Sequence, residues 1–319
     1  MKRLTFLVLT DHSGHSDQNS LYSLVNTLVA DPRSGRVDVA SRGDERNADF
    51  FRGDGAQVWG IAVDRELVYS PNGAAFQLGV HELAPLEYDV IWLRLPHPIP
   101  EAFFINLATN VPGIPPLIVN DPAGIETTST KAFLTNFPEW TPPTRLVHTR
   151  EQAEAFTREH PIVLKPLRAF GGHGILRLDR PEDARKVSFE EPYLAMKFLK
   201  NVSQGDKRIL VVNGKIMAAS LRVPRPGEWL CNVARGGTSV SADIDPEEES
   251  MIAALAPELL GRGICFAGID TLVDDGGKRV LSEINTLSIG GFPQAEVQTG
   301  RPILQQTIDE FFSYCYDRL

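Results

Sequence analysis

Two apolar segments that each carry acidic side chains, separated by a glycine pair, constrain the fold more than any other feature. Residues 268–285 read GIDTLVDDGGKRVLSEIN, and Gly276-Gly277 predicts a two-residue hairpin turn between two strands. In that register Asp270 lies directly opposite Glu283, and Asn285 shares their face because side chains alternate along a strand. The sequence therefore predicts an antiparallel strand pair on which three oxygen ligands converge.

Facing carboxylates need a positive partner, because like charges directly opposite each other destabilise a strand pair. The overlapping residues 264–269 (ICFAGI) predict burial, which raises the cost of an uncompensated charge. Few hard oxygen ligands suit Mg²⁺ that is completed by phosphate oxygens and water. Two alternatives stay open: the acids pair with Lys or Arg on a solvated face, or a one-residue bulge breaks the register.

The first part of the chain predicts an α/β unit. Leu4–Leu9 reads as a buried strand, and the apolar residues of 21–29 recur with helical spacing. Asp89–Leu95 and Leu117–Asn120 read as further strands. Continuous apolar strands that alternate with a helix favour a parallel sheet.

Shorter elements follow and predict a compact α+β middle section and a sheet-rich last third. The expected helices are Thr128–Asn136, Glu151–Glu159, Pro246–Leu260 and Arg301–Leu319. The expected strands are Arg145–His148, Ile162–Pro166, Ile175–Leu178, Tyr193–Leu199, Arg208–Val212, Lys215–Val223, Ile264–Val273 and Lys278–Asn285. Asn213-Gly214 predicts a tight hairpin turn. The expected units are residues 1–122, 123–202 and 203–319.

Composition narrows the function classes. The 319 residues carry 32 Lys and Arg against 41 Asp and Glu, a net charge of −9, which argues against a general nucleic-acid or anionic-membrane binder. The chain has no apolar run of the roughly 18 residues that span a bilayer. Cys231, Cys265 and Cys315 lack disulfide or zinc spacing and favour a reducing cytoplasm.

A locally basic segment interrupts the acidic background. Residues 162–178 contain Lys165, two arginines and no acid. They include Gly171, Gly172 and Gly174, whose backbone N–H groups are suited to a close approach to an anion. The segment matches neither a Walker loop nor GxGxxG, so a simple hairpin turn is the alternative. Together with carboxylates for Mg²⁺, these groups make up the parts needed for phosphoryl transfer.

Several segments share their order and spacing with one known family. They are DVIWLRLPHP, IVNDPAGI, IVLKPLRAFGGHGI, GDKRILVVNG, LRVPRPGE, NVARGG, GIDTLV and LSEIN, and they cover most of the chain. In these segments the chain resembles the ATP-grasp superfamily, specifically bacterial glutathione synthetases. The resemblance implies an α/β fold in which a parallel-sheet domain on the substrate side precedes a two-lobed ATP-grasp fold.

The resemblance also implies roles for individual residues. Those that would bind ATP are Lys131, Lys165, Gly171, Gly172, Gly174, Lys197, Phe198, Leu199 and Asp206. Those that would contact the transferring phosphoryl group are Arg208 and Arg222. Those that would hold two Mg²⁺ ions, with Mn²⁺ as an alternative, are Asp270, Glu283 and Asn285. Those that would face the substrates are Asn232 and Arg235.

Arg94 is a further candidate for the substrate side. It ends an apolar strand of the predicted parallel sheet. Open α/β sheets bind ligands at the carboxyl ends of their strands, so this guanidinium is placed to meet a substrate carboxylate.

The implied reaction joins a small-molecule carboxylate to an amine. The carboxylate attacks the γ-phosphate of ATP to give an acyl phosphate and ADP, and the amine then displaces phosphate. Protein catalysis of this kind consists mainly of positioning and charge neutralisation.

Departures from the family pattern cluster on the acceptor side. After the metal-binding Asn the family typically continues Val-Thr-Ser-Pro-Thr, whereas residues 286–292 here read TLSIGGF. Leu230 and Thr238 stand where the family usually has substrate-binding arginines. Losing such a charge partner typically costs several kcal/mol unless Arg225 or Arg235 compensates. A ligase of altered specificity is therefore predicted.

Trp229, Leu230 and Phe292 would make a more apolar acceptor pocket, or they simply pack. Three alternatives for the function stay open. The chain is a true glutathione synthetase, an ATP-grasp nucleotide-binding module without ligase activity, or a kinase that releases a stable phosphate. Related ligases often form dimers or tetramers, so a homo-oligomer is an open alternative for the assembly.

Overall fold

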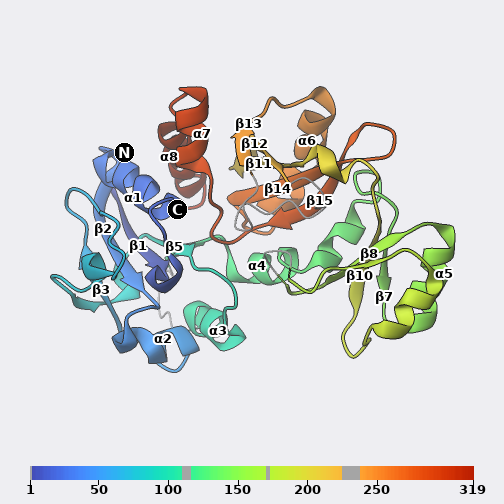
Figure 1. The fold of residues 1–319 in the computed structure, drawn as a ribbon. Helices are drawn as coiled ribbons and strands as arrows, with labels where there is room; N and C mark the ends of the chain where they lie inside the picture. The colour runs from blue at the N-terminus through green and yellow to red at the C-terminus, as the bar shows by residue number, and fades with distance from the viewer. Residues whose placement is uncertain (1, 110–115, 170–172, 225–237) are drawn as a thin grey trace.

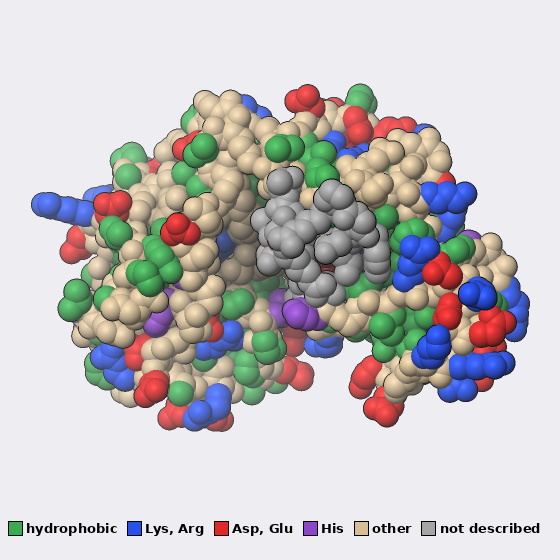
Figure 2. Space-filling model, viewed as in Figure 1, with side chains coloured by type: hydrophobic (Ala, Val, Ile, Leu, Met, Phe, Trp, Pro, Cys, Tyr) green, Lys and Arg blue, Asp and Glu red, His purple; other side chains and the backbone are tan. Residues whose placement is uncertain are grey.

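The computed structural model describes residues 2–109, 116–169, 173–224 and 238–319, which form three sheets (Figure 1). Both ends of the chain lie beside the first sheet. Acidic and basic side chains are interspersed on the face shown in Figure 2, most densely over the lobe that carries α5. Among the described residues no helix is long and apolar enough to cross a membrane.

The N-terminal sheet has six strands in the order β4-β3-β2-β1-β5-β6. They are β1 Leu4–Thr10, β2 Ser34–Ser41, β3 Val58–Ala62, β4 His81–Leu83, β5 Val90–Arg94 and β6 Leu117–Val119. The α-helices of this part are α1 Ser20–Ala30, α2 Ala48–Arg52 and α3 Glu101–Thr109. Strands β2, β1, β5 and β6 run parallel, as the apolar runs predict, whereas β3 and β4 pair antiparallel.

The central sheet is antiparallel, in the order β7-β10-β8-β9. Its strands are β7 Thr144–Val147, β8 Ile162–Pro166, β9 Leu176–Leu178 and β10 Tyr193–Lys197. Helix α5, Arg150–Glu159, packs on it through the fully buried Phe156. The single helix expected over Thr128–Asn136 is wrong. Helix α4, Pro122–Thr128, ends there, and a separate 3-10 helix, η5 Lys131–Asn136, begins after the capping Thr130.

The C-terminal sheet is antiparallel, in the order β13-β12-β11-β14-β15. Its strands are β11 Asp206–Val212, β12 Lys215–Val223, β13 Thr238–Ser241, β14 Phe266–Val273 and β15 Arg279–Asn285. Helix α6, Pro246–Leu260, matches its expected bounds, because Asp245 and Glu248 form a capping box. The turn at Asn213-Gly214 has positive φ at both residues, as its sequence predicts.

Two C-terminal helices, α7 Phe292–Thr299 and α8 Ile303–Tyr316, connect the first and third sheets. Phe311 of α8 lies 5.7 Å from Phe6 of β1 and 4.8 Å from Trp92 of β5 between ring centroids. It also lies 5.2 Å from Phe266 of β14. One apolar cluster is therefore shared by the N-terminal and C-terminal parts, beside α1 (Figure 1). The unit boundaries at 122 and 202 stay a prediction.

Short 3-10 helices complete the fold. They are η1 His12–Gly14, η2 Glu45–Asn47, η3 Ala74–Phe76, η4 Pro85–Glu87, η6 Pro181–Lys186 and η7 Val202–Gln204.

The expected pairing of the acidic hairpin is confirmed, but the expected turn is wrong. Asp270 lies opposite Glu283. The loop has three residues rather than two, because Asp274 pairs with Lys278 through a 2.8 Å backbone hydrogen bond. A one-residue register shift between the turn and Asp270 leaves Ser282 outside the ladder and restores the pairing. The turn and the bulge therefore displace the register by one residue each, in opposite directions.

Candidate functional site

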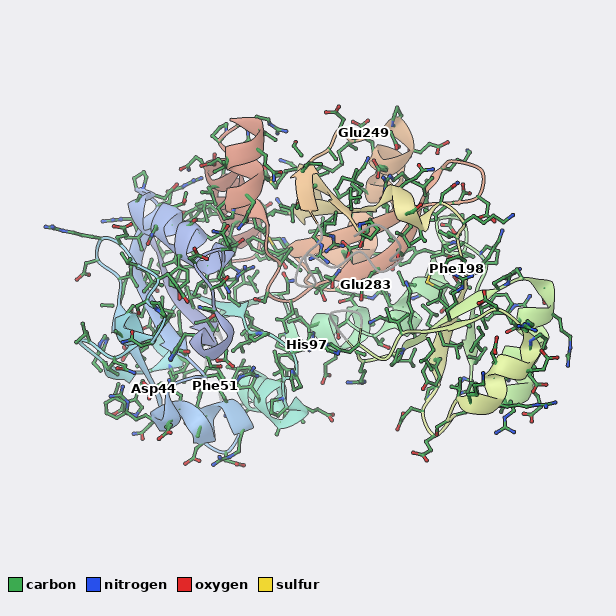
Figure 3. All side chains as sticks on the ribbon, viewed as in Figure 1. Asp44, Phe51, His97, Phe198, Glu249 and Glu283 are labelled. Carbon is green, nitrogen blue, oxygen red and sulfur yellow. The ribbon has the colours of Figure 1, made fainter. Side chains whose placement is uncertain are left out.

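A cavity of about 310 Å³ lies between the central and C-terminal sheets, a size suited to a small-molecule site. Near the β14–β15 turn its lining is apolar, with Val163, Ile175, Met196, Leu272 and Leu281. Farther along the same strands it is charged. Figure 3 shows Glu283 on the sheet edge that faces the central lobe and Phe198 at the neighbouring end of that lobe.

The charged end of the cavity is a row of side chains on one face of the C-terminal sheet. Asp206 lies opposite Arg222, Arg208 lies opposite Asp270, and Asp270 lies opposite Glu283. Asn285 lies two residues beyond Glu283 and donates from Nδ2 to Asp270 Oδ2 at 3.2 Å. Strand pairing therefore brings residues far apart in the sequence into one ionic cluster.

Asp270 is the centre of this cluster. Arg208 binds it with two donors, Nε to Oδ1 at 2.7 Å and Nη2 to Oδ2 at 2.6 Å, and Arg222 Nη2 lies 2.9 Å from Oδ2. Burial disfavours its charge, but the two guanidinium groups outweigh burial and hold the pKa of Asp270 well below its usual range. Asp270 is therefore a buried carboxylate that stays ionised.

Asp206 has the opposite electrostatic environment. Burial first, and then the charge of Asp270, raise the pKa of Asp206 well above its usual range. Arg222 donates to its Oδ2, whereas Asp206 Oδ1 and Arg222 Nε are buried without a partner among the described residues. Unsatisfied buried polar atoms are costly, so these two point to a polar ligand that completes the site.

Two lysines from the central part reach the same cluster. Lys131, at the start of η5, donates to the Ala169 carbonyl and lies 3.1 Å from Glu283 Oε1. Lys165, on β8, donates from Nζ to the carbonyl and to the hydroxyl of Ser282, each at 3.1 Å. Burial lowers the pKa of Lys165, Glu283 opposes this, and Lys131 reinforces it. At the charged end of the cavity, four cations among the described residues thus meet three carboxylates.

The segment that follows β10 borders the apolar end. Lys197, Phe198 and Leu199 all line the cavity. Lys197 Nζ lies 2.8 Å from Asp275 Oδ2, and the Lys200 amide donates to Asp275 Oδ1 at 2.8 Å. The β14–β15 turn therefore holds this segment against the apolar pocket.

The remaining predicted residues lie elsewhere. Gly171, Gly172, Asn232 and Arg235 fall outside the described residues. Gly174 has φ +69 and sits between His173 and Ile175, which both line the cavity. Arg94 does not line it: the side chain is buried, and Nη2 donates to the Ile289 carbonyl at 2.6 Å. Burial alone lowers the pKa of Arg94 to about 10.

One correction concerns a residue outside that set. Phe292 is fully buried in the shared apolar core, so it packs and is no part of an acceptor pocket. Trp229 and Leu230 fall outside the described residues. Ser282 and His173 also line the cavity, and neither was among the predicted site residues. Ser282 directly precedes the predicted metal ligand Glu283. This position in the sequence was the one available indication that Ser282 lies at the site.

The donor set fits a divalent cation with a hard oxygen preference. Asp270, Glu283 and Asn285 share one sheet face, and Asn285 uses its amide nitrogen for Asp270, which leaves its amide oxygen for a metal. Among the described residues, Lys131 lies against Glu283, and Arg208 and Arg222 lie against Asp270.

Sequence comparisons place these features in a known group. Residues 130–300 match the family described as prokaryotic glutathione synthetase, ATP-grasp domain. The chain is 35% identical over 247 residues to a glutathione synthetase of Rhodopseudomonas palustris, covering 74% of this chain and 76% of that protein.

Solved structures share the fold. D-cycloserine synthetase DcsG superposes with a TM-score of 0.67 at 12% identity, covering 98% of this chain and 99% of the other. The ATP-grasp ligase PsnB, in a complex with a precursor variant, Mg and ADP, superposes with a TM-score of 0.59 at 16% identity. That match covers 99% of this chain and 100% of the other.

Proposed function

Because the chain belongs to the prokaryotic glutathione synthetase family and is an ATP-dependent, ADP-forming carboxylate–amine ligase, we propose that its catalytic site is the cavity between the central and C-terminal sheets. The observation that carries this proposal is the division of the cavity. An apolar end suits a purine, and an end with four cations and three carboxylates suits phosphates with a divalent cation.

The nucleotide would lie along the β14–β15 strands. The segment Lys197–Leu199 would border adenine, and Lys131 and Lys165 would bind phosphates. Asp206 would lie beside the nucleotide, and Gly171, Gly172 and Gly174 would cover the phosphates. The closeness of Lys197 to the hairpin turn and of the two lysines to Glu283 and Ser282 supports this direction.

Asp270, Glu283 and Asn285 would hold Mg²⁺, two ions in our proposal, with Mn²⁺ as an alternative. When bound, the metal neutralises phosphate charge and fixes the phosphate oxygens in place. The support comes from facing carboxylates on a buried strand pair, a ligand set with hard oxygen atoms.

The side chains of this protein would bind and orient the reacting groups. Arg208 and Arg222 would neutralise the γ-phosphoryl group, and Asp270 holds both guanidinium groups in position. A substrate carboxylate oxygen would form a bond to the γ-phosphorus of ATP. At the same time the bond between the γ-phosphorus and the bridging oxygen would break, and that oxygen would leave with ADP. The amine nitrogen then bonds the acyl carbon, phosphate leaves, and the amine loses a proton.

The substrates are small molecules, and we propose a pair other than γ-glutamylcysteine and glycine. Residues 286–291 depart from the family pattern, and they form a loop in which Ser288 has φ +49 and Ile289 is 2% exposed. Arg94, which contacts this loop and has no acidic partner among the described residues, would act on the substrate side with Asn232 and Arg235. Cytoplasmic location, assembly as a homo-oligomer and absence of nucleic-acid binding are further proposals.

One screen tests the substrate proposal. Purified protein is incubated with ATP and Mg²⁺ against amino acids, small acids and dipeptides, with ADP release and product mass as readouts. We expect an acid and an amine pair that gives ADP and an amide together. Efficient turnover of γ-glutamylcysteine with glycine would overturn the altered specificity and establish the second candidate, a true glutathione synthetase, which the 35% identity favours. A stable phosphorylated product without amide would overturn the ligase step.

A further inference from the structure

The bulge at Ser282 lies where the two ATP-grasp lobes meet. Strand β15 is the edge strand of the C-terminal sheet, and its free edge faces the central lobe. On the turn side Thr271 pairs with Leu281, and on the far side Asp270 pairs with Glu283. Ser282 alone is left outside the ladder, so its backbone carbonyl is released from pairing with β14.

The carbonyl and the hydroxyl of Ser282 both accept hydrogen bonds from Lys165 of the other lobe. Lys165 Nζ donates to the Ser282 carbonyl and to its Oγ, each at 3.1 Å. Next to this contact, the Leu281 amide donates to the Trp140 carbonyl at 2.7 Å. Two consecutive residues of β15 therefore bridge the lobes, and one of the bridges ends on a cavity-lining ammonium group.

A lysine in this position needs such a partner. Its four-carbon stem loses much conformational freedom when it is held in one orientation, and its charge is costly to bury without acceptors. Ser282 is 9% exposed, so water competes little for these bonds. An ammonium group has three donors, and the two acceptors of Ser282 leave at least one N–H for a ligand.

We propose that Ser282 is a positioning residue, which holds the Lys165 ammonium group at the phosphate end of the cavity through its hydroxyl and its bulged carbonyl. The bulge thus has a second use besides restoring the pairing of Asp270 with Glu283. This inference rests on the proposed function, specifically on phosphate binding by Lys165.

The test compares nucleotides that differ in phosphate content. For Ser282→Ala we expect the Kd for ADP and for ATP, measured by calorimetry with Mg²⁺, to rise about tenfold, because one hydrogen bond to a charged group is lost. The Kd for adenosine should stay unchanged, since adenosine carries no phosphate. Ser282→Thr keeps the hydroxyl and should retain wild-type affinity. Ser250→Ala, on the exposed side of α6, is the matched serine control.

A double-mutant cycle with Lys165→Met tests whether Ser282 affects phosphate binding through Lys165. If Ser282 acts through Lys165, adding Ser282→Ala to Lys165→Met changes the Kd for ADP no further. Additive losses, or an equal loss of adenosine affinity, would overturn the positioning role, as would wild-type ADP affinity in Ser282→Ala. If Lys165→Met itself binds ADP normally, the proposed phosphate site fails instead. The unfolding midpoint of each variant is measured alongside, and Ser282→Thr keeps the test decisive if Ser282→Ala folds poorly.

Discussion

The β11–β12 and β14–β15 hairpins of the C-terminal sheet both change register by one residue between their turn and the far end of their strands. The residue left out of the ladder is Met217 in the first hairpin and Ser282 in the second. Met217 is 5% exposed and packs in the apolar core, whereas Ser282 faces the cavity and binds Lys165. The same backbone device thus serves packing in one hairpin and a polar site in the other.

The position of the two bulges explains why both matter for the site. Each lies between its turn and the charged residues, so each sets which side chains face each other farther along. Asp206 meets Arg222 beyond the first bulge, and Asp270 meets Glu283 beyond the second. The ionic cluster therefore depends on two register changes as well as on the identity of its members.

Removing the central carboxylate should give the largest difference in activity between changes at the two hairpins. Asp270→Asn leaves Arg208 and Arg222 without their shared partner and takes away a proposed Mg²⁺ ligand. We expect kcat/KM for ADP release to fall by about 10²- to 10³-fold. The control is Glu310→Gln, because Glu310 contacts Asn213 and Lys215 at the other hairpin. Activity of Asp270→Asn within threefold of wild type would contradict the proposed site.

The bulge residue of the first hairpin should affect stability and leave binding intact. Met217→Ala removes buried apolar volume, and we expect the free energy of unfolding to fall by about 2–5 kcal/mol in chemical denaturation. The KM for ATP should stay at the wild-type value, since Met217 packs in the core. A rise in that KM comparable with the effect of Ser282→Ala would remove the distinction between the two bulges.

The smallest expected difference between the hairpins is the stability lost when a turn glycine is replaced by alanine. Gly214 and Gly277 have φ +73 and +90, where an alanine costs about 1–2 kcal/mol of stability. A Cβ at Gly214 would also lie 3.1 Å from Leu260 Cδ1 and 3.2 Å from Ala256 Cβ, whereas nothing lies within 4 Å at Gly277. Denaturation midpoints should therefore drop more for Gly214→Ala than for Gly277→Ala. The reverse order would show that strain in the longer turn dominates.

The acidic hairpin shows how far sequence reasoning reaches. Alternation and a glycine pair predict that Asp270 faces Glu283, and the structure has this pair. The turn itself differs, because the Asp274 side chain accepts from the amides of Gly276 and Lys278 and closes a three-residue loop. The bulged Ser282 contacts Lys165, which lies 117 residues away, so no local pattern predicts this contact.

Strand β2 was not predicted from the sequence, for a related reason. The local pattern of β2, SGRVDVAS, does not predict a buried strand. Asp38 is nevertheless fully buried, because Tyr88 donates to it at 2.9 Å and Arg36 pairs with it. Arg36 lies on the same strand, but Tyr88 comes from a distant segment, and such a partner makes a buried carboxylate compatible with the interior.

Local patterns in the sequence set the chemistry that this protein has available. The spacing of acids, lysines and glycines indicated phosphoryl transfer, and apolar periodicity indicated most strands and helices, because these patterns are local and repeat with the strand and helix periods. The resemblance of several segments to ATP-grasp ligases implied the Lys, Arg, Asp and Glu residues that line the cavity. Tertiary structure alone decided how the lobes meet, that Phe292 joins the core, and that Ser282 binds Lys165. Those outcomes depend on contacts between segments far apart in the chain, whose geometry no short stretch of sequence contains.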